Sequence, residues 1–224
     1  MNRFFNMDNK FFIFMGRVAD LIILNLVCLL CCLPIVTAGA AITATYYVTM
    51  KMVRNEESYI IRSFFKSFKE NFKQATIIHL IMLVTAVILF FDLNIVNNME
   101  GNLSRVLFCV FIAFTLLYAL LLLYVYPVLA KFYNSLKNTF TNSFLMAIRH
   151  LPYTFLMLVI TLLPLGIFFI PDFRIQSTLL MLVFLMGFSV IAYLNSKFLV
   201  KIFDHYIPKE EETEELPDSQ ETQA

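Results

Sequence analysis

The sequence has little charge, few histidines and no tryptophan. Only 15% of its 224 residues are charged, whereas a soluble domain carries about 25%. Hydrophobic residues make up 60% of the chain and the mean hydropathy is +0.77, which is more apolar side chain than one core can bury. This composition excludes a soluble enzyme, a disordered protein and a nucleic-acid binder of the basic-patch kind. The net charge of +1 gives no overall field that would attract an acidic partner.

Recognisable catalytic and metal-binding motifs are also missing. The three histidines are scattered, and none stands in H-E-x-x-H or a similar ligand spacing. There is no P-loop, no G-x-S-x-G motif and no serine beside a plausible base. Cys28 and Cys31 form a C-x-x-C pattern without a second pair, which favours packing thiols over redox chemistry. We therefore predict no catalytic residue, no cofactor, no metal and no enzymatic activity; an intramembrane enzyme is the least favoured class.

Five long stretches contain no Asp, Glu, Lys or Arg: 21–50, 74–91, 106–130, 150–171 and 175–196. A helix needs about 20 apolar residues to span a bilayer. The first stretch is too long for one span and contains Pro34 and Gly39, which stop a helix and permit a turn. We divide it into two helices at about 18–33 and 37–53, so the sequence predicts six transmembrane helices in an all-α fold.

The distribution of basic residues predicts the topology. With six spans, 15 of the 17 Lys and Arg residues fall on one side, and only Arg105 and Arg174 fall on the other. Because cytoplasmic flanks collect basic residues, we expect both termini in the cytoplasm and the protein in the plasma membrane. Five spans would give a weaker split. A cleaved signal peptide would leave the basic segment 51–73 outside, which disfavours that alternative.

The chain divides into a membrane domain, 1–207, and a tail, 208–224. The membrane domain contains three hairpins, at 18–53, about 74–130 and about 151–203. The tail has seven acidic residues and one lysine, so we expect it to be disordered. The membrane domain is left with an excess of basic residues, which suits the anionic inner leaflet of the bilayer as a partner.

Two cytoplasmic segments have amphipathic helical patterns. In 58–73 the apolar face carries four phenylalanines, and the opposite stripe is basic: Arg62, Lys66, Lys69 and Lys73. This pattern predicts an interfacial helix whose basic residues contact lipid. Segment 136–150 repeats it more weakly, and each segment precedes a membrane hairpin. A duplicated unit and a chance similarity of composition both remain open.

Polar and turn-forming residues of the first hairpin are the candidate intramembrane site: Arg17, Asp20, Asn25, Pro34, Thr37, Gly39, Thr43 and Tyr47. Ionisable groups at membrane depth are costly and often functional. Arg17 and Asp20 share a helix face, and we favour an interfacial pair over a functional one. Asn25 is expected to bridge helices. The threonines of 37–53 either line a polar path or satisfy one another inside the bundle, and the second is commoner.

Several motifs carry a family resemblance. They are Gly16-Arg17-x-x-Asp20-Leu21, Leu33-Pro34-Ile35-Val36-Thr37-x-Gly39-Ala40, Arg54-Asn55-Glu56-Glu57 and the run from Phe64 to Thr76. These motifs resemble the YesL-like family of small bacterial integral membrane proteins, strongest over 14–76. The family has no established molecular function and supplies no catalytic residues. Its members are often encoded beside carbohydrate uptake and sensing genes, so the resemblance implies an accessory role there. The lack of tryptophan and the Cys31-Cys32 pair depart from the usual pattern.

The sequence therefore predicts a six-helix membrane protein with two cytoplasmic interfacial helices. The expected function is a non-enzymatic accessory or regulatory role, with a carbohydrate transporter or sensor protein as partner. The alternative is a small transporter or channel with a polar path along the second helix. A transporter requires water to reach Asp20, Asn25 and the threonines, whereas an accessory protein requires a tightly packed bundle.

Overall fold

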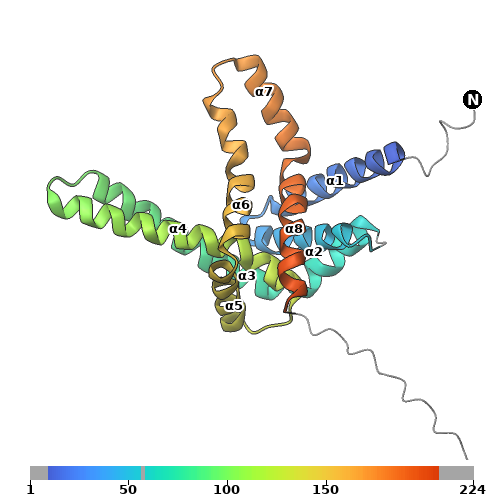
Figure 1. Cartoon of the computed structure of the whole chain (residues 1–224), viewed down its shortest axis with the longest axis horizontal. Helices are drawn as coiled ribbons and strands as arrows, with labels where there is room; N and C mark the ends of the chain where they lie inside the picture. Colours follow the sequence, from blue (N-terminus) through green and yellow to red (C-terminus); the bar gives the residue numbers. More distant parts are fainter. Residues whose placement is uncertain (1–9, 57–58, 207–224) are drawn as a thin grey trace, which may run out of the picture.

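A computed structural model describes residues 10–56 and 59–206, and every regular element within them is helical. The predicted all-α class is confirmed for this part of the chain. It contains eight α-helices (Figure 1): α1 Lys10–Cys32, α2 Ala38–Val53, α3 Ile60–Asn97, α4 Asn102–Lys131, α5 Leu136–Arg149, α6 Leu151–Leu162, α7 Phe173–Leu182 and α8 Phe188–Asp204. A 3-10 segment at Leu163–Phe169 extends α6, and a π-helical turn at Val183–Gly187 joins α7 to α8.

Helix α2 lies at the centre of the fold, in contact with α1, α3, α4 and α8 (Figure 1). Its buried residues are mostly small: Gly39, Ala40, Ala41, Thr43, Ala44, Thr45, Val48, Thr49 and Met50. Small side chains let neighbouring backbones come close, which is how helices gain contact when lipid removes the hydrophobic driving force between them. Ala40 packs against α3 and α4, whereas Ala44 packs against α1 and α3. Helix α2 therefore gives the surrounding helices a common packing surface.

The turn between α1 and α2 forms where the sequence predicts a break. Helix α1 ends at Cys32, Pro34 follows with an extended backbone, and a 3-10 turn at Ile35–Thr37 leads into α2. The Thr37 hydroxyl donates to the carbonyl oxygens of Cys31, at 2.6 Å, and Pro34, at 2.9 Å. Thr37 thus satisfies a carbonyl that α1 leaves unpaired at its end.

At Gly39, helix α2 approaches α3 closely. A Cβ atom at this position would lie 2.6 Å from the backbone oxygen of Ala75 and 2.6 Å from the Cβ of His79. Non-bonded atoms do not approach so closely, so only glycine fits without movement of α3. The glycine read from the sequence as part of a turn is therefore also a close helix contact.

Five helical segments are long and apolar enough to cross a membrane. They are Phe11–Cys32, Ile60–Asn97, Asn102–Lys131, Leu151–Phe169 and Phe173–Asp204. The sixth predicted span, α2, has 16 residues. It covers about 24 Å at 1.5 Å per residue, against a hydrocarbon core of about 30 Å. The described residues thus contain five candidate spans, where the sequence analysis predicted six.

The two predicted interfacial helices differ in the structure. The segment 58–73 forms no separate element: its described part is the first portion of α3, a continuous helix of 38 residues. No proline or glycine interrupts the chain from Ile60 to Asn97, so nothing ends the helix there. Helix α5, in contrast, is separate from α6. The break falls at His150, with φ −115° and ψ 40°, and Pro152 lies in the first turn of α6, where a helix tolerates proline.

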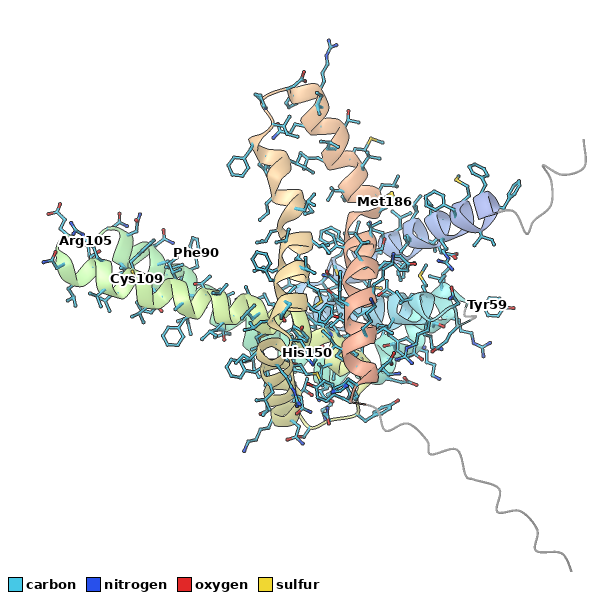
Figure 2. All side chains as sticks on the ribbon, viewed as in Figure 1. Tyr59, Phe90, Arg105, Cys109, His150 and Met186 are labelled. Atoms are coloured by element: carbon cyan, nitrogen blue, oxygen red, sulfur yellow. The ribbon has the colours of Figure 1, made fainter. Side chains whose placement is uncertain are left out.

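Two apolar arms extend away from α2 in different directions (Figure 1). One is the outer part of the α3–α4 hairpin, and Figure 2 shows Phe90, Arg105 and Cys109 along it. The other is the α6–α7 hairpin. Large apolar side chains are exposed on both arms, for example Phe90 at 64% and Phe155 at 65%. Surfaces this apolar indicate contact with a lipid bilayer rather than water.

We predict that Gly39→Ala destabilises the protein by about 1–3 kcal/mol, since overpacking a tight contact has that cost. The added Cβ meets the backbone of α3, which cannot rotate away as a side chain could. Thermal unfolding in detergent measures the effect.

Gly16→Ala is the matched control, because nothing lies within 4 Å of a Cβ at that position in α1. Alanine favours a helix over glycine by up to about 1 kcal/mol, so this variant should be as stable as the natural protein or more so. Equal stability changes in the two variants would contradict the close contact at Gly39.

Candidate functional site

The threonines of α2 are buried and hydrogen-bonded within their own helix. The Thr43 hydroxyl donates to the carbonyl oxygen of Gly39 at 2.8 Å, and the Thr45 hydroxyl donates to that of Ala41 at 2.9 Å. Thr49 donates to the Thr45 carbonyl at 3.0 Å. Threonine in a membrane helix commonly uses the carbonyl four residues earlier in this way. These hydroxyls therefore have partners without water.

Two hydroxyl pairs join distant helices inside the bundle. The Thr49 and Ser196 side-chain oxygens lie 2.8 Å apart and connect α2 to α8. The Tyr124 hydroxyl and the Thr154 side-chain oxygen are also 2.8 Å apart and connect α4 to α6. Sequence analysis did not identify Tyr124, Thr154 or Ser196, because no local pattern relates residues so far apart in the chain.

Asn25 bridges α1 and the last long helical segment at its π-helical turn. Its side-chain amide donates to the Phe184 carbonyl at 2.8 Å, and its side-chain oxygen accepts from the Ser189 backbone N–H at 3.1 Å. A π-helical turn disturbs the regular hydrogen bonding of an α-helix and leaves such groups in need of partners. The Ser189 hydroxyl also donates to the Leu21 carbonyl at 2.6 Å. One buried amide thus completes the irregular backbone of the neighbouring helix.

Arg17 and Asp20 line an open cavity of about 600 Å³ with Asn55, Glu56 and Tyr59. Tyr59 lies near the connection from α2 to α3 (Figure 2). The Arg17 guanidinium donates to the Asn55 side-chain oxygen at 2.6 Å and to the Tyr193 hydroxyl at 3.5 Å.

The predicted pairing of Arg17 with Asp20 is not found. The ion pairs within the described residues are Lys51 with Glu56 and Arg54 with Asp204. Helix spacing allows Arg17 and Asp20 to meet, but the loop after α2 brings Asn55 within reach of the guanidinium and supplies a better-placed acceptor.

A second cavity, of about 270 Å³, lies between the end of α2, the first part of α3 and the end of α4. Tyr47 and Lys51 of α2 form part of its wall, and the Lys51 ammonium lies 5.3 Å from the centre of the Tyr47 ring. Of the candidate residues of the first hairpin, Tyr47 is the one found here.

The basic stripe predicted from the sequence is present and solvent-exposed on α3. It comprises Arg62, Lys66, Lys69 and Lys73. Phe64 and Ser67, on the same stretch of helix, are buried against the bundle. Lys66 is the member of the stripe that also lines the second cavity. The exposure of the stripe is compatible with lipid contact, which stays a prediction.

Two partly buried histidines pair with tyrosines that sequence analysis did not connect to them. His79 Nδ1 lies 2.8 Å from the Tyr126 hydroxyl, and His150 Nε2 lies 3.0 Å from the Tyr206 hydroxyl. Figure 2 shows His150 where α5 meets α6. Partial burial, with Arg149 and His205 nearby, lowers the pKa of His150 below its ordinary value of 6.5. The neutral ring is therefore the favoured form in the folded protein.

Within 10–56 and 59–206, no three His, Cys, Asp or Glu side chains gather in a way that could hold a metal ion. The predicted acidic tail, 208–224, lies outside the described residues, as do Glu57 and Ser58. The candidate site therefore consists of the hydrogen bonds between helices and the two cavities that charged side chains line.

Comparisons with known proteins agree with the resemblance seen in the sequence. A family described as "Protein of unknown function, DUF624" matches residues 21–93, which contain all of α2 and most of α3. The chain is 29% identical over 150 residues to "Uncharacterized protein YesL" of Bacillus subtilis (strain 168). That match covers 66% of this chain and 70% of the relative. No solved structure gives a significant match.

We predict that Asn25→Leu destabilises the protein by about 2–6 kcal/mol, because it leaves the Phe184 carbonyl and the Ser189 N–H without a partner in the interior. Each buried polar group left unsatisfied costs about 1–3 kcal/mol. Asn94→Leu is the control: Asn94 is exposed on α3, and its side chain donates only to the Phe90 carbonyl of its own helix. A loss of melting temperature as large for Asn94→Leu as for Asn25→Leu would contradict the bridge.

We also predict that the protein loses stability as the pH falls from 7.5 to 5.5. A histidine whose pKa is lowered by folding binds more protons in the unfolded chain, so the stability it contributes is present above pH 6.5 and decreases below it. His150→Gln keeps a polar partner for Tyr206 and removes the titration. The variant should show a smaller fall in melting temperature over this range, and an unchanged fall would contradict the assignment.

Proposed function

Starting from the confirmed resemblance to the YesL-like family, we propose that this chain is a non-enzymatic accessory or regulatory protein of the cell membrane. Its proposed partner is a component of a carbohydrate uptake or sensing system. The observation that best supports this proposal is the tight packing of α2. Its small residues are in contact with four other helices, and its threonine hydroxyls are bonded to backbone carbonyls.

The alternative, a transporter with a path along α2, has less support. A path needs polar side chains that face water, and Thr43, Thr45 and Thr49 are at most 3% exposed. Asn25 is fully buried and uses its amide on the neighbouring helix. Asn25 and these threonines therefore serve as contacts between and within helices. Of the residues that a path would use, Asp20 is the one that lines an open cavity.

The proposed topology keeps six crossings, with α2 as a short span and both termini in the cytoplasm. A helix enclosed by other helices need not match the thickness of the lipid, because protein surrounds its backbone. Arg54 after α2 pairs with Asp204 at the end of α8, so the two helix ends lie together. Basic residues gather near these ends, which favours the cytoplasmic side for them. The first part of α3, which continues the membrane-crossing part of the same helix, and helix α5 would then lie on the cytoplasmic side.

The accessory role is tested by isolating the tagged full-length protein from cross-linked native membranes. Mass spectrometry should identify components of a sugar uptake or sensing system, enriched over a tagged membrane protein of similar size. In parallel, proteoliposomes containing the purified chain should take up no labelled sugar. Absence of such a partner, together with saturable sugar uptake, would overturn the proposal in favour of a transporter.

Packing of α2 is tested by exchanging small residues. Ala44 is fully buried between α1 and α3, so Ala44→Leu should cost about 1–3 kcal/mol through overpacking. Thr43→Val removes only a bond to a carbonyl of its own helix and should have little effect on melting temperature or phenotype. A stable Ala44→Leu variant with a functionally impaired Thr43→Val variant would favour a polar path instead.

A further inference from the structure

The cavity of about 270 Å³ at the ends of α2 and α4 is lined by more positive than negative charge. Its cationic side chains come from three helices: Lys51 and Arg54 from the end of α2, Lys66 from α3 and Lys131 from the end of α4. Two carboxylates, Glu56 and Glu70, also line it, together with Asn71, Tyr47 and Tyr133. The four cations and two carboxylates leave the wall with an excess of positive charge.

Two of these cations already have a negative partner. The Lys51 ammonium lies 4.0 Å from a Glu56 carboxylate oxygen and also faces the Tyr47 ring. Arg54 pairs with Asp204 at the end of α8. These contacts fix Lys51 and Arg54 in place at the cavity wall.

Lys66 and Lys131 form no ion pair within the described residues, although they line the same cavity from different helices. Glu70, one helical turn after Lys66, lines the wall without forming an ion pair there either. Lys131 lies in the last turn of α4, where a cation also offsets the helix dipole, but Lys66 lies well inside α3. The helix dipole therefore does not account for Lys66.

Two aromatic residues, Phe132 and Tyr133, form one edge of the cavity. They belong to the connection from α4 to α5, and Tyr133 is 94% exposed. Tyrosine is enriched at the level of lipid headgroups. Polar ligands at this level include the phosphates of lipids and of dissolved metabolites.

We propose that this cavity binds a phosphate group, with Lys66 and Lys131 as the residues that hold its charge. Lysine binds phosphate as a compact point charge with three N–H donors, and two lysines from separate helices can contact different oxygens of one phosphate. The cavity volume is several times the volume that one water molecule occupies in the liquid, about 30 Å³. A phosphoglycerol headgroup therefore fits as well as a free phosphate. The site is independent of the accessory role proposed above.

The test uses the full-length chain in a neutral detergent, with melting temperature as the measure of binding. The probes are inorganic phosphate and dihexanoyl phosphatidylglycerol below its micelle concentration. Sodium chloride at equal ionic strength and dihexanoyl phosphatidylcholine, whose phosphate is neutralised by choline, are the references. We expect at least one phosphate probe to raise the melting temperature above its reference. Stabilisation by the lipid alone identifies a headgroup site, and stabilisation by both identifies a site that also takes free phosphate.

Three variants locate the binding. Lys66→Gln with Lys131→Gln should require about 30-fold more probe for the same shift, since each lysine contributes about 1 kcal/mol and every step of about 1.4 kcal/mol is tenfold in affinity. Lys137→Gln with Lys201→Gln is the matched control, since it removes the same charge from exposed positions on α5 and α8, outside both the cavity and the basic stripe of α3. It should respond as the natural protein does. Glu70→Gln removes a repelling carboxylate and should require less probe.

Three results would overturn the proposal. No shift with either probe would show that the cavity does not bind phosphate. Equal weakening in both double variants would assign the effect to general surface charge. A lower melting temperature without a changed response to the probe, in the Lys66→Gln and Lys131→Gln variant, would mean that these lysines only stabilise the fold.

Discussion

The structure depends on how closely the backbone of α2 approaches its neighbours. At Gly39 there is no room for even one carbon atom between α2 and the Ala75 carbonyl of α3. Ala40 and Ala44 continue this close contact along the helix. In a membrane, helices gain little from hiding apolar surface, so the dispersion and hydrogen bonding that close contact allows must hold them together. The positions of α1, α3, α4 and α8 all follow from this central helix.

The same constraint explains how polar groups are arranged in the interior. Most buried hydroxyl and amide groups in this bundle have a protein partner. The exceptions among the described residues are the side-chain oxygens of Thr76, Ser143 and Asn195. The threonines use carbonyls of α2, and Asn25 supplies both a donor and an acceptor to the π-helical turn before α8. Charged residues are placed differently. They meet at the ends of α2, α4 and α8, where water can reach them and where the phosphate site is proposed.

Much of this organisation could be predicted from the sequence, because a membrane helix requires a long local stretch of apolar residues. The charge-free stretches identified the long helices, and Pro34 identified the turn after α1. The continuous α3 was missed, because an amphipathic pattern and an apolar pattern can follow each other without a break when no proline or glycine intervenes. The partners of Asn25, His150 and Arg54 were also missed, since they lie from 56 to 164 residues away. Such contacts depend on tertiary packing and leave no local signal.

The claim that α2 is a packed central helix is tested most directly by measuring whether water reaches it. With the native cysteines replaced, single cysteines at positions 43, 45 and 49 would be exposed to a charged, water-soluble thiol reagent in native membranes. Tyr133→Cys, in the exposed connection after α4, shows the rate at an open position. We predict rapid labelling at 133 and protection at all three α2 positions until the protein is unfolded. Labelling of the α2 positions at a rate close to that of 133 would contradict a packed central helix and indicate a water-filled path.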